Sequence, residues 1–175
     1  QNPTFTYTAG GFYDVTLTAS NACGADTETK VGFISVLGND ECAGAIPVVV
    51  GLNGPFTNSG STTSLPAWPC AAGGSDVWFS FTATCPQTVT FDTCTGSSYD
   101  TCIEVFDGSC GALNSLICND DSCGLQSSAT VTAVVGATYY VRVGGYGGRQ
   151  GNFSLNVTTS GAGTFSTITT GCGAN

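Results

Sequence analysis

Carboxylate side chains are concentrated between positions 100 and 121 of the chain. With one amide they form a candidate ligand set of Asp100, Glu104, Asp107, Asn119, Asp120 and Asp121. Calcium takes roughly six to eight oxygen ligands, most of them from carboxylates and loop carbonyls. These residues therefore predict a calcium site between the Asp100–Asp107 segment and the Asn119–Asp121 loop. The alternative is turn chemistry, in which the aspartates accept backbone N–H groups.

The same residue types argue against catalysis. The chain has no histidine, so serine and cysteine nucleophiles lack their usual base. A glycosidase needs two carboxylates that flank one bond. Asp120 and Asp121 are adjacent and point to opposite faces if they lie on a strand. We therefore expect no enzymatic activity.

The cysteines indicate disulfides. There are ten, with no histidine and no paired C-x-x-C knuckle that would suggest zinc. They are Cys23, Cys42, Cys70, Cys85, Cys94, Cys102, Cys110, Cys118, Cys123 and Cys172. Local spacing favours Cys85–Cys94 and Cys110–Cys118, and the other pairings stay open. We expect at least four disulfides within residues 39–158 and an extracellular or cell-surface location, because disulfides persist in oxidising compartments.

Charge limits the class of partner. The formal net charge is −9, and the three cations are Lys30, Arg142 and Arg149. Nothing in such a chain could neutralise phosphates, so nucleic acid is excluded as a partner. No stretch is long and apolar enough to cross a bilayer, so no membrane insertion is expected.

Aromatic side chains suggest a second kind of site. The alternation of Val77, Phe79 and Phe81 predicts that these three face inward and that Trp78 faces outward. Exposed aromatic rings can stack on sugars, and the candidates for a glycan-binding platform are Trp68, Trp78, Tyr99 and Tyr146. The alternative is that these rings belong to the core or plug a loop.

Two Asn-x-Ser/Thr sequences near the end of the chain match the glycosylation acceptor pattern. They begin at Asn152 and Asn156. The strand alternation there places Phe153, Leu155 and Val157 inward, which leaves both asparagines facing outward. Both are candidate glycosylation sites.

These candidates must be positioned by strands, because short β-rich runs alternate with Gly, Asn, Asp and Ser clusters and no run has a helical period. The runs predict an all-β chain with a sandwich or jelly roll. The expected strands after residue 38 are 46–50, 76–83, 88–92, 101–106, 113–117, 129–134, 138–144 and 152–157.

Several motifs in this region keep a common order. They include Asn39-Asp-Glu-Cys, Ser75-Asp-Val-Trp-Phe-Ser-Phe, Val105-Phe-Asp-Gly, Cys118-Asn-Asp-Asp and Gly151-Asn-Phe-Ser-Leu. Residues 38–158 thereby resemble bacterial pre-peptidase C-terminal-like domains. The resemblance implies a jelly-roll accessory module of a secreted bacterial protein, associated with binding, secretion or assembly and not itself catalytic.

Residues 1–37 read as a separate, incomplete unit. The run from Phe5-Thr-Tyr through Gly-x-Tyr-x-Val-x-Leu to Asn-x-x-Gly, ending at Gly24, resembles the second half of a PKD-type immunoglobulin-like domain. The resemblance implies an incomplete β-sandwich whose first strands lie elsewhere. We expect a strand at 12–23 with Tyr13, Val15 and Leu17 on one face, and a further strand at 31–36.

Residues 159–175 are expected to form a Gly-rich hinge and one orphan strand. The candidate assembly residues of both ends are Tyr13, Val15, Leu17, Phe33, Phe165 and Ile168. A strand with one apolar face needs a covering layer. The sequence therefore predicts a structural or adhesive module that assembles by strand or domain complementation with neighbouring copies or adjoining domains. The alternatives are a window on a long multidomain protein and a carbohydrate-binding accessory module of a secreted hydrolase.

Overall fold

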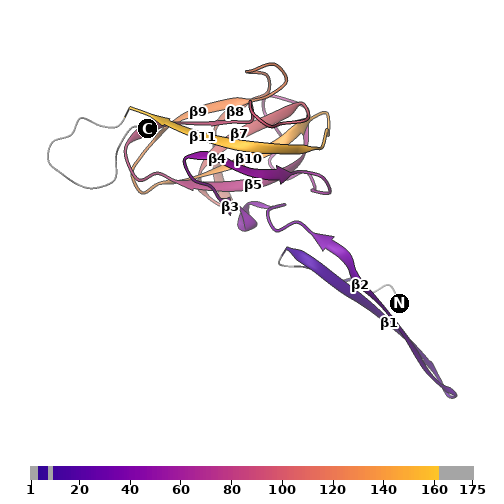
Figure 1. The fold of residues 1–175 in the computed structure, drawn as a ribbon. Coiled ribbons are helices and arrows are strands. Elements are labelled where there is room, and N and C mark those ends of the chain that lie inside the picture. The colour runs from indigo at the N-terminus through magenta and orange to yellow at the C-terminus, as the bar shows by residue number, and fades with distance from the viewer. Residues whose placement is uncertain (1–3, 8–9, 162–175) are drawn as a thin grey trace. The chain divides into compact units, whose positions relative to one another are not determined.

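A computed structural model describes residues 4–7 and 10–161, and the protein is all-β as expected (Figure 1). The chain divides into two compact units, Gln1–Gly38 and Asn39–Asn175. Residues 162–175, which include Phe165, Ile168 and Cys172, lie outside the described residues, so the predicted terminal strand is not described.

The first unit contains a hairpin of β1 (Gly11–Asn21) and β2 (Gly24–Val36). Its turn holds Cys23, whose amide donates to Asn21 Oδ1 at 2.7 Å. The sequence predicted strands at 12–23 and 31–36, but β2 begins directly at Gly24. The hairpin is therefore longer than expected, because the polar residues 24–29 pair with residues 16–21 of β1.

The second unit contains two sheets. It begins with a short 3-10 turn, η1 (Cys42–Gly44), followed by nine strands in the described part of the chain. These are β3 (Ile46–Pro47), β4 (Gly51–Thr57), β5 (Gly73–Thr82), β6 (Gln87–Asp92), β7 (Thr101–Ser109), β8 (Ala112–Asn119), β9 (Ser128–Ala133), β10 (Thr138–Tyr146) and β11 (Asn152–Ser160). The strand orders are β3-β5-β10-β7-β8 and β4-β11-β6-β9, antiparallel apart from the β3–β5 pair.

The two sheets pack face to face through aromatic side chains. Phe79 on β5 lies 4.7 Å from Phe56 on β4 and 5.9 Å from Phe153 on β11, measured between ring centroids. Phe81 and Phe91 make a similar contact at 5.7 Å. The predicted alternation is confirmed on β5 and β11, whose inward side chains are at most 5% exposed: Val77, Phe79, Phe81, Phe153, Leu155 and Val157.

Strand β4 has no counterpart among the predicted strands. It contains Gly51, Gly54 and Pro55, which are turn signals in a sequence. A register shift in its pairing with β11 accommodates Gly54, whose φ is +122°. The Asn53 side chain also binds the backbone of Val49 and Leu155, which holds this irregular strand in place.

The disulfides join distant segments. They include Cys42–Cys110, Cys70–Cys118 and Cys94–Cys123. The predicted pairs Cys85–Cys94 and Cys110–Cys118 are wrong, because each spacing is the length of a single strand (β6 or β8). A strand rises about 3.3 Å per residue, so its two ends lie far beyond disulfide distance.

Two of the ten cysteines named as disulfide candidates are free thiols. Cys23 is an exposed free thiol and Cys102 a buried one, whereas Cys85 is disulfide-bonded. Three disulfides, rather than at least four, have both cysteines within the described residues 39–158.

Candidate metal centre

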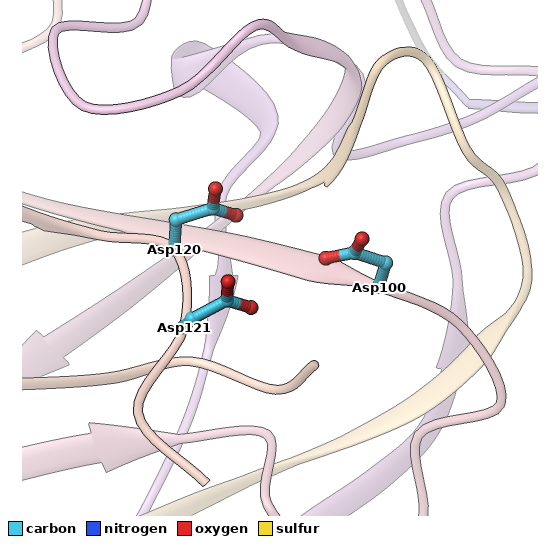
Figure 2. A group of neighbouring side chains, drawn as sticks. All are labelled: Asp100, Asp120 and Asp121. Carbon is cyan, nitrogen blue, oxygen red and sulfur yellow. The ribbon is translucent and has the colours of Figure 1, made fainter. Parts of the chain in front are cut away.

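Three of the predicted calcium ligands meet at one edge of the five-stranded sheet. Asp100 directly precedes β7, and Asp120 and Asp121 directly follow β8. Because β7 and β8 are antiparallel neighbours with Ile103 opposite Asn119, the start of one strand lies beside the end of the other. Carboxylate oxygens of the three aspartates lie within 4.8 Å of one another (Figure 2). Asp120 and Asp121 lie just beyond the end of β8, where side chains no longer alternate between two faces. These two adjacent side chains can therefore point to the same side.

The Asp100 carboxylate is largely withdrawn from water. Its side chain is 13% exposed, and its Oδ1 atom is buried without a hydrogen-bond partner. Its Oδ2 atom lies 3.9 Å from Nε of the exposed Arg149. Burial and the Asp120 and Asp121 carboxylates raise the pKa of Asp100, and Arg149 partly opposes that change. An unpartnered oxygen among three carboxylates fits a bound cation, so the donor set suits calcium.

The neighbouring thiol of Cys102 does not belong to this donor set. It is fully buried and donates to Asp120 Oδ1 at a sulfur–oxygen distance of 3.1 Å. Burial and the adjacent Asp120 raise the pKa of this thiol, so it stays protonated. Its role here is to orient Asp120.

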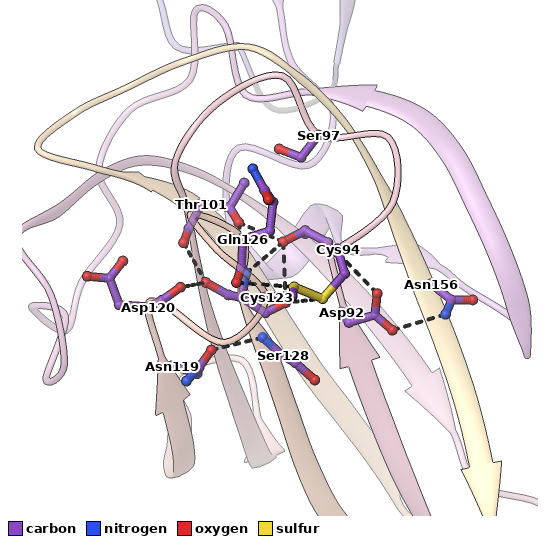
Figure 3. Close-up of a disulfide and its surroundings, with 12 residues drawn as sticks. Asp92, Cys94, Ser97, Thr101, Asn119, Asp120, Cys123, Gln126, Ser128 and Asn156 are labelled. Carbon is purple, nitrogen blue, oxygen red and sulfur yellow. Dashed lines mark hydrogen bonds between the residues drawn. A yellow bond between two sulfur atoms is a disulfide. The ribbon is translucent and has the colours of Figure 1, made fainter.

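The loop that carries Asp120 and Asp121 is fastened to β6 and β7. The Cys94–Cys123 disulfide ties it to the end of β6 (Figure 3). The Ser127 hydroxyl donates to the backbone oxygens of Thr101 and Asp120. Ser127 itself is fully buried, so water does not compete for these bonds.

The other predicted ligands bind other partners. Asn119 Oδ1 accepts from the Ser128 amide at 2.9 Å (Figure 3), and Asp107 Oδ1 accepts from Asn114 Nδ2 at 3.0 Å. At about 3.3 Å per residue, Glu104 and Asp107 lie roughly 13 and 23 Å along β7 from Asp100. Strand geometry therefore carries Glu104 and Asp107 away from the predicted site, whereas Asn119 directly precedes Asp120 and has its Oδ1 engaged by Ser128.

Glu104 instead belongs to a buried charge network that the sequence did not reveal. Its Oε2 accepts from Arg142 Nε at 2.9 Å and also from Nη2, while Ser115 donates to Oε1. Arg142 and Glu104 are 0% and 1% exposed. Asp76, fully buried, lies 3.8 Å from Arg142 Nη1. Burial raises the pKa of Asp76 against the opposing effects of the Ser64 hydrogen bonds and Arg142.

The segment between β4 and β5 covers this network. Arg142 Nη1 donates to the backbone oxygens of Ser64 and Pro66, and its guanidinium stacks on the Trp68 ring at 4.2 Å. Trp68 Nε1 donates to Asp76, and the Cys70–Cys118 disulfide ties the segment to β8. The outer face of β5 is therefore buried as well as the inner one.

This covering segment corrects the predicted glycan platform. Trp68 is 9% exposed and Trp78 is 1% exposed, so neither can stack on a sugar. The Tyr99 ring packs on Phe153, with a centroid distance of 6.3 Å, and its hydroxyl is buried. Of the four candidates only Tyr146, 44% exposed, presents a ring to solvent. A cue in the sequence was the Pro-rich run around Trp68, which is typical of a fixed loop.

The two glycosylation candidates differ. Asn152 is exposed, whereas Asn156 is half-buried and donates from Nδ2 to Asp92 Oδ2 at 3.0 Å (Figure 3). Both face away from the core, as the alternation predicted, but the Asn156 amide is already engaged.

Three of the four assembly candidates of the hairpin are exposed, and the fourth, Tyr13, is half-buried. Val15, Leu17 and Phe33 are 37%, 70% and 60% exposed, and Tyr13 packs against Tyr7 at a ring distance of 4.5 Å. Their face is less apolar than predicted. The register places Lys30 opposite Val15 and Glu28 opposite Leu17, so β2 supplies charges beside the apolar row of β1.

No protein-family model, curated protein or solved structure matches this chain. The three disulfides indicate an oxidising, extracellular environment. Among the described residues no helix is long and apolar enough to cross a membrane.

Proposed function

We propose that this chain is a non-catalytic structural or adhesive module of a bacterial surface protein or filament, which assembles by β-strand or domain complementation. The proposal rests on the exposed apolar side chains of the first unit. In the described part of the chain it has a sheet of only two strands, and Phe12, Leu17 and Val31 on it are 70–82% exposed. An isolated two-stranded sheet is marginally stable in water. Burying such side chains contributes roughly 1.5–3 kcal/mol each, so a partner that covers them would stabilise the hairpin substantially.

The family resemblances enter the same proposal. The order in which strands β4–β11 are distributed between the two sheets supports a pre-peptidase C-terminal-like jelly roll. The β1–β2 hairpin supports the second half of a PKD-type domain. Partners are then neighbouring copies or adjoining domains of the same protein. The carbohydrate-binding alternative receives no such support, because two of its four aromatic candidates are buried.

Calcium is proposed as a structural ion of the second unit. Asp100, Asp120 and Asp121 would hold it, and the buried Oδ1 of Asp100 supports this assignment. The two positive charges of the ion would offset most of the repulsion among the three carboxylates and so stabilise the loop end of the sandwich.

Hydrogen exchange on the dilute, monomeric full chain tests the assembly proposal. We expect the amides of β1 and β2 to exchange quickly there, because the described residues form no second layer over this sheet, while those of β5 and β10 exchange slowly. Slow exchange throughout β1 in the monomer would show that the hairpin is stable alone, and the proposal would lose its basis.

A further inference from the structure

The two outer edges of the hairpin differ in charge. Between residues 15 and 21, β1 carries only apolar, hydroxyl and amide side chains. The facing stretch of β2 carries Asp26, Glu28 and Lys30. Charged side chains on an edge strand oppose the addition of another strand. By charge alone, β1 is the edge that accepts a neighbour and β2 the edge that repels one.

The two edges also differ in regularity. Tyr13 pairs with Ile34 and Val15 with Lys30, so three residues of β2 oppose the single residue Asp14 of β1. This bulge contains Gly32, whose φ is +61° and whose amide donates to Asp14 Oδ1 at 2.7 Å. A bulge twists an edge away from pairing. The same hydrogen bond engages Asp14, which is the only charged residue of β1.

The uncharged part of β1 is complementary to itself. Antiparallel pairing with a second β1, centred on Thr18, would place Thr18 opposite Thr18, Leu17 opposite Ala19 and Thr16 opposite Ser20. Apolar side chains would then meet on one face and hydroxyls on the other, with no charged pair. The exposed β2 charges would remain on the outside of a four-stranded sheet.

We propose that β1 is the assembly edge and that its partner is the β1 strand of a second copy of this chain, in a two-fold symmetric antiparallel pair. The inference rests on the proposed function and names its edge and its occupant.

Thr18 and Thr27 provide a matched test. They face each other across the hairpin, both are exposed, and their hydroxyls share one hydrogen bond of 3.0 Å. Thr18→Lys and Thr27→Lys therefore lose the same contact and add the same charge, but on different edges. Sedimentation of the full chain over a range of concentrations measures the monomer–dimer equilibrium.

We expect the wild-type chain to dimerise reversibly. Thr18→Lys should raise the dissociation constant about fivefold, because it places two like charges opposite each other, and Thr27→Lys should change it less than about twofold. An equal effect, or a larger effect of Thr27→Lys, would overturn the assignment of the edge. A chain that stays monomeric would overturn the second copy as the partner and leave a strand from another protein in that role. The hydrogen-exchange experiment tests the proposed function separately.

A cross-link adds a readout that does not depend on the stability of the hairpin. In a Cys23→Ser background, Thr18→Cys should form a disulfide-linked dimer under mild oxidation by oxidised glutathione, because opposed Cα atoms in antiparallel strands lie about 4.5–5.5 Å apart. Thr27→Cys should not. Cross-linking of Thr27→Cys alone would refute the β1 edge.

Discussion

Replacing Glu104 by Gln isolates the charge that faces Arg142. The substitution keeps the shape of a side chain that is 1% exposed, replaces one acceptor oxygen by an NH2 donor, and leaves the guanidinium buried without its closest carboxylate. Breaking a buried pair costs about 3–5 kcal/mol. The lower figure applies because Asp76 still lies 3.8 Å from Arg142. We therefore expect a loss of about 3 kcal/mol in the free energy of unfolding and a Tm lowered by roughly 10 °C.

Urea denaturation of the oxidised chain, followed by tryptophan fluorescence, measures this loss because Trp68 and Trp78 adjoin the network. Asp107→Asn is the control, since its side chain only bonds Asn114 at the surface. It should change the unfolding free energy by less than about 0.5 kcal/mol. The loss for Glu104→Gln should be equal with calcium and with a chelator. A loss below about 1 kcal/mol, or one seen only with calcium, would refute the assignment of Glu104 to the network.

Calcium, pH and thiol labelling each provide a further test. Millimolar calcium should raise the Tm of the wild-type chain by several degrees relative to a chelator, as expected for an ion that binds the folded state, and Asp100→Asn should abolish this shift; coincident wild-type melts would contradict the calcium site. With chelator present, the raised pKa of Asp100 makes the folded state more stable when this carboxyl is protonated. That contribution is complete below the ordinary aspartate range and is lost as pH rises through the raised pKa. Asp100→Asn should therefore stabilise the metal-free chain at neutral pH and flatten its pH dependence. Of the two free thiols among the described residues, a maleimide should label Cys23 in the native chain and Cys102 only after unfolding, as located by peptide mapping; rapid native labelling of both would contradict the burial of Cys102.

The all-β class and much of the core were accessible from local sequence. Alternation on β5 and β11 placed Phe79 and Leu155 inward because side chains on a strand alternate between faces whatever the strand pairs with. Asp100, Asp120 and Asp121 were identified as candidate ligands for a related reason. Acids at the ends of consecutive strands stand out by residue type, and the antiparallel β7–β8 pair brings them together.

Other features depend on contacts between distant segments, which local patterns do not encode. The pairing of Cys42 with Cys110 and of Cys70 with Cys118 follows from the order of strands in the sheet. Trp78 reads as outward from alternation, yet the segment around Trp68 buries it on that side. Glu104 likewise reads as a metal ligand until Arg142, on the next strand of the sheet, is seen to pair with it.

The sequence by itself therefore determined the all-β character of the chain and its inward-facing residues, because these depend on the period of a strand and on residue type. Only the tertiary structure decided which cysteines pair, which carboxylates converge and which tryptophans are covered. Each of these depends on the lateral order of strands and on a loop that folds back over the sheet, and strand order is set by packing over many residues rather than by any short segment.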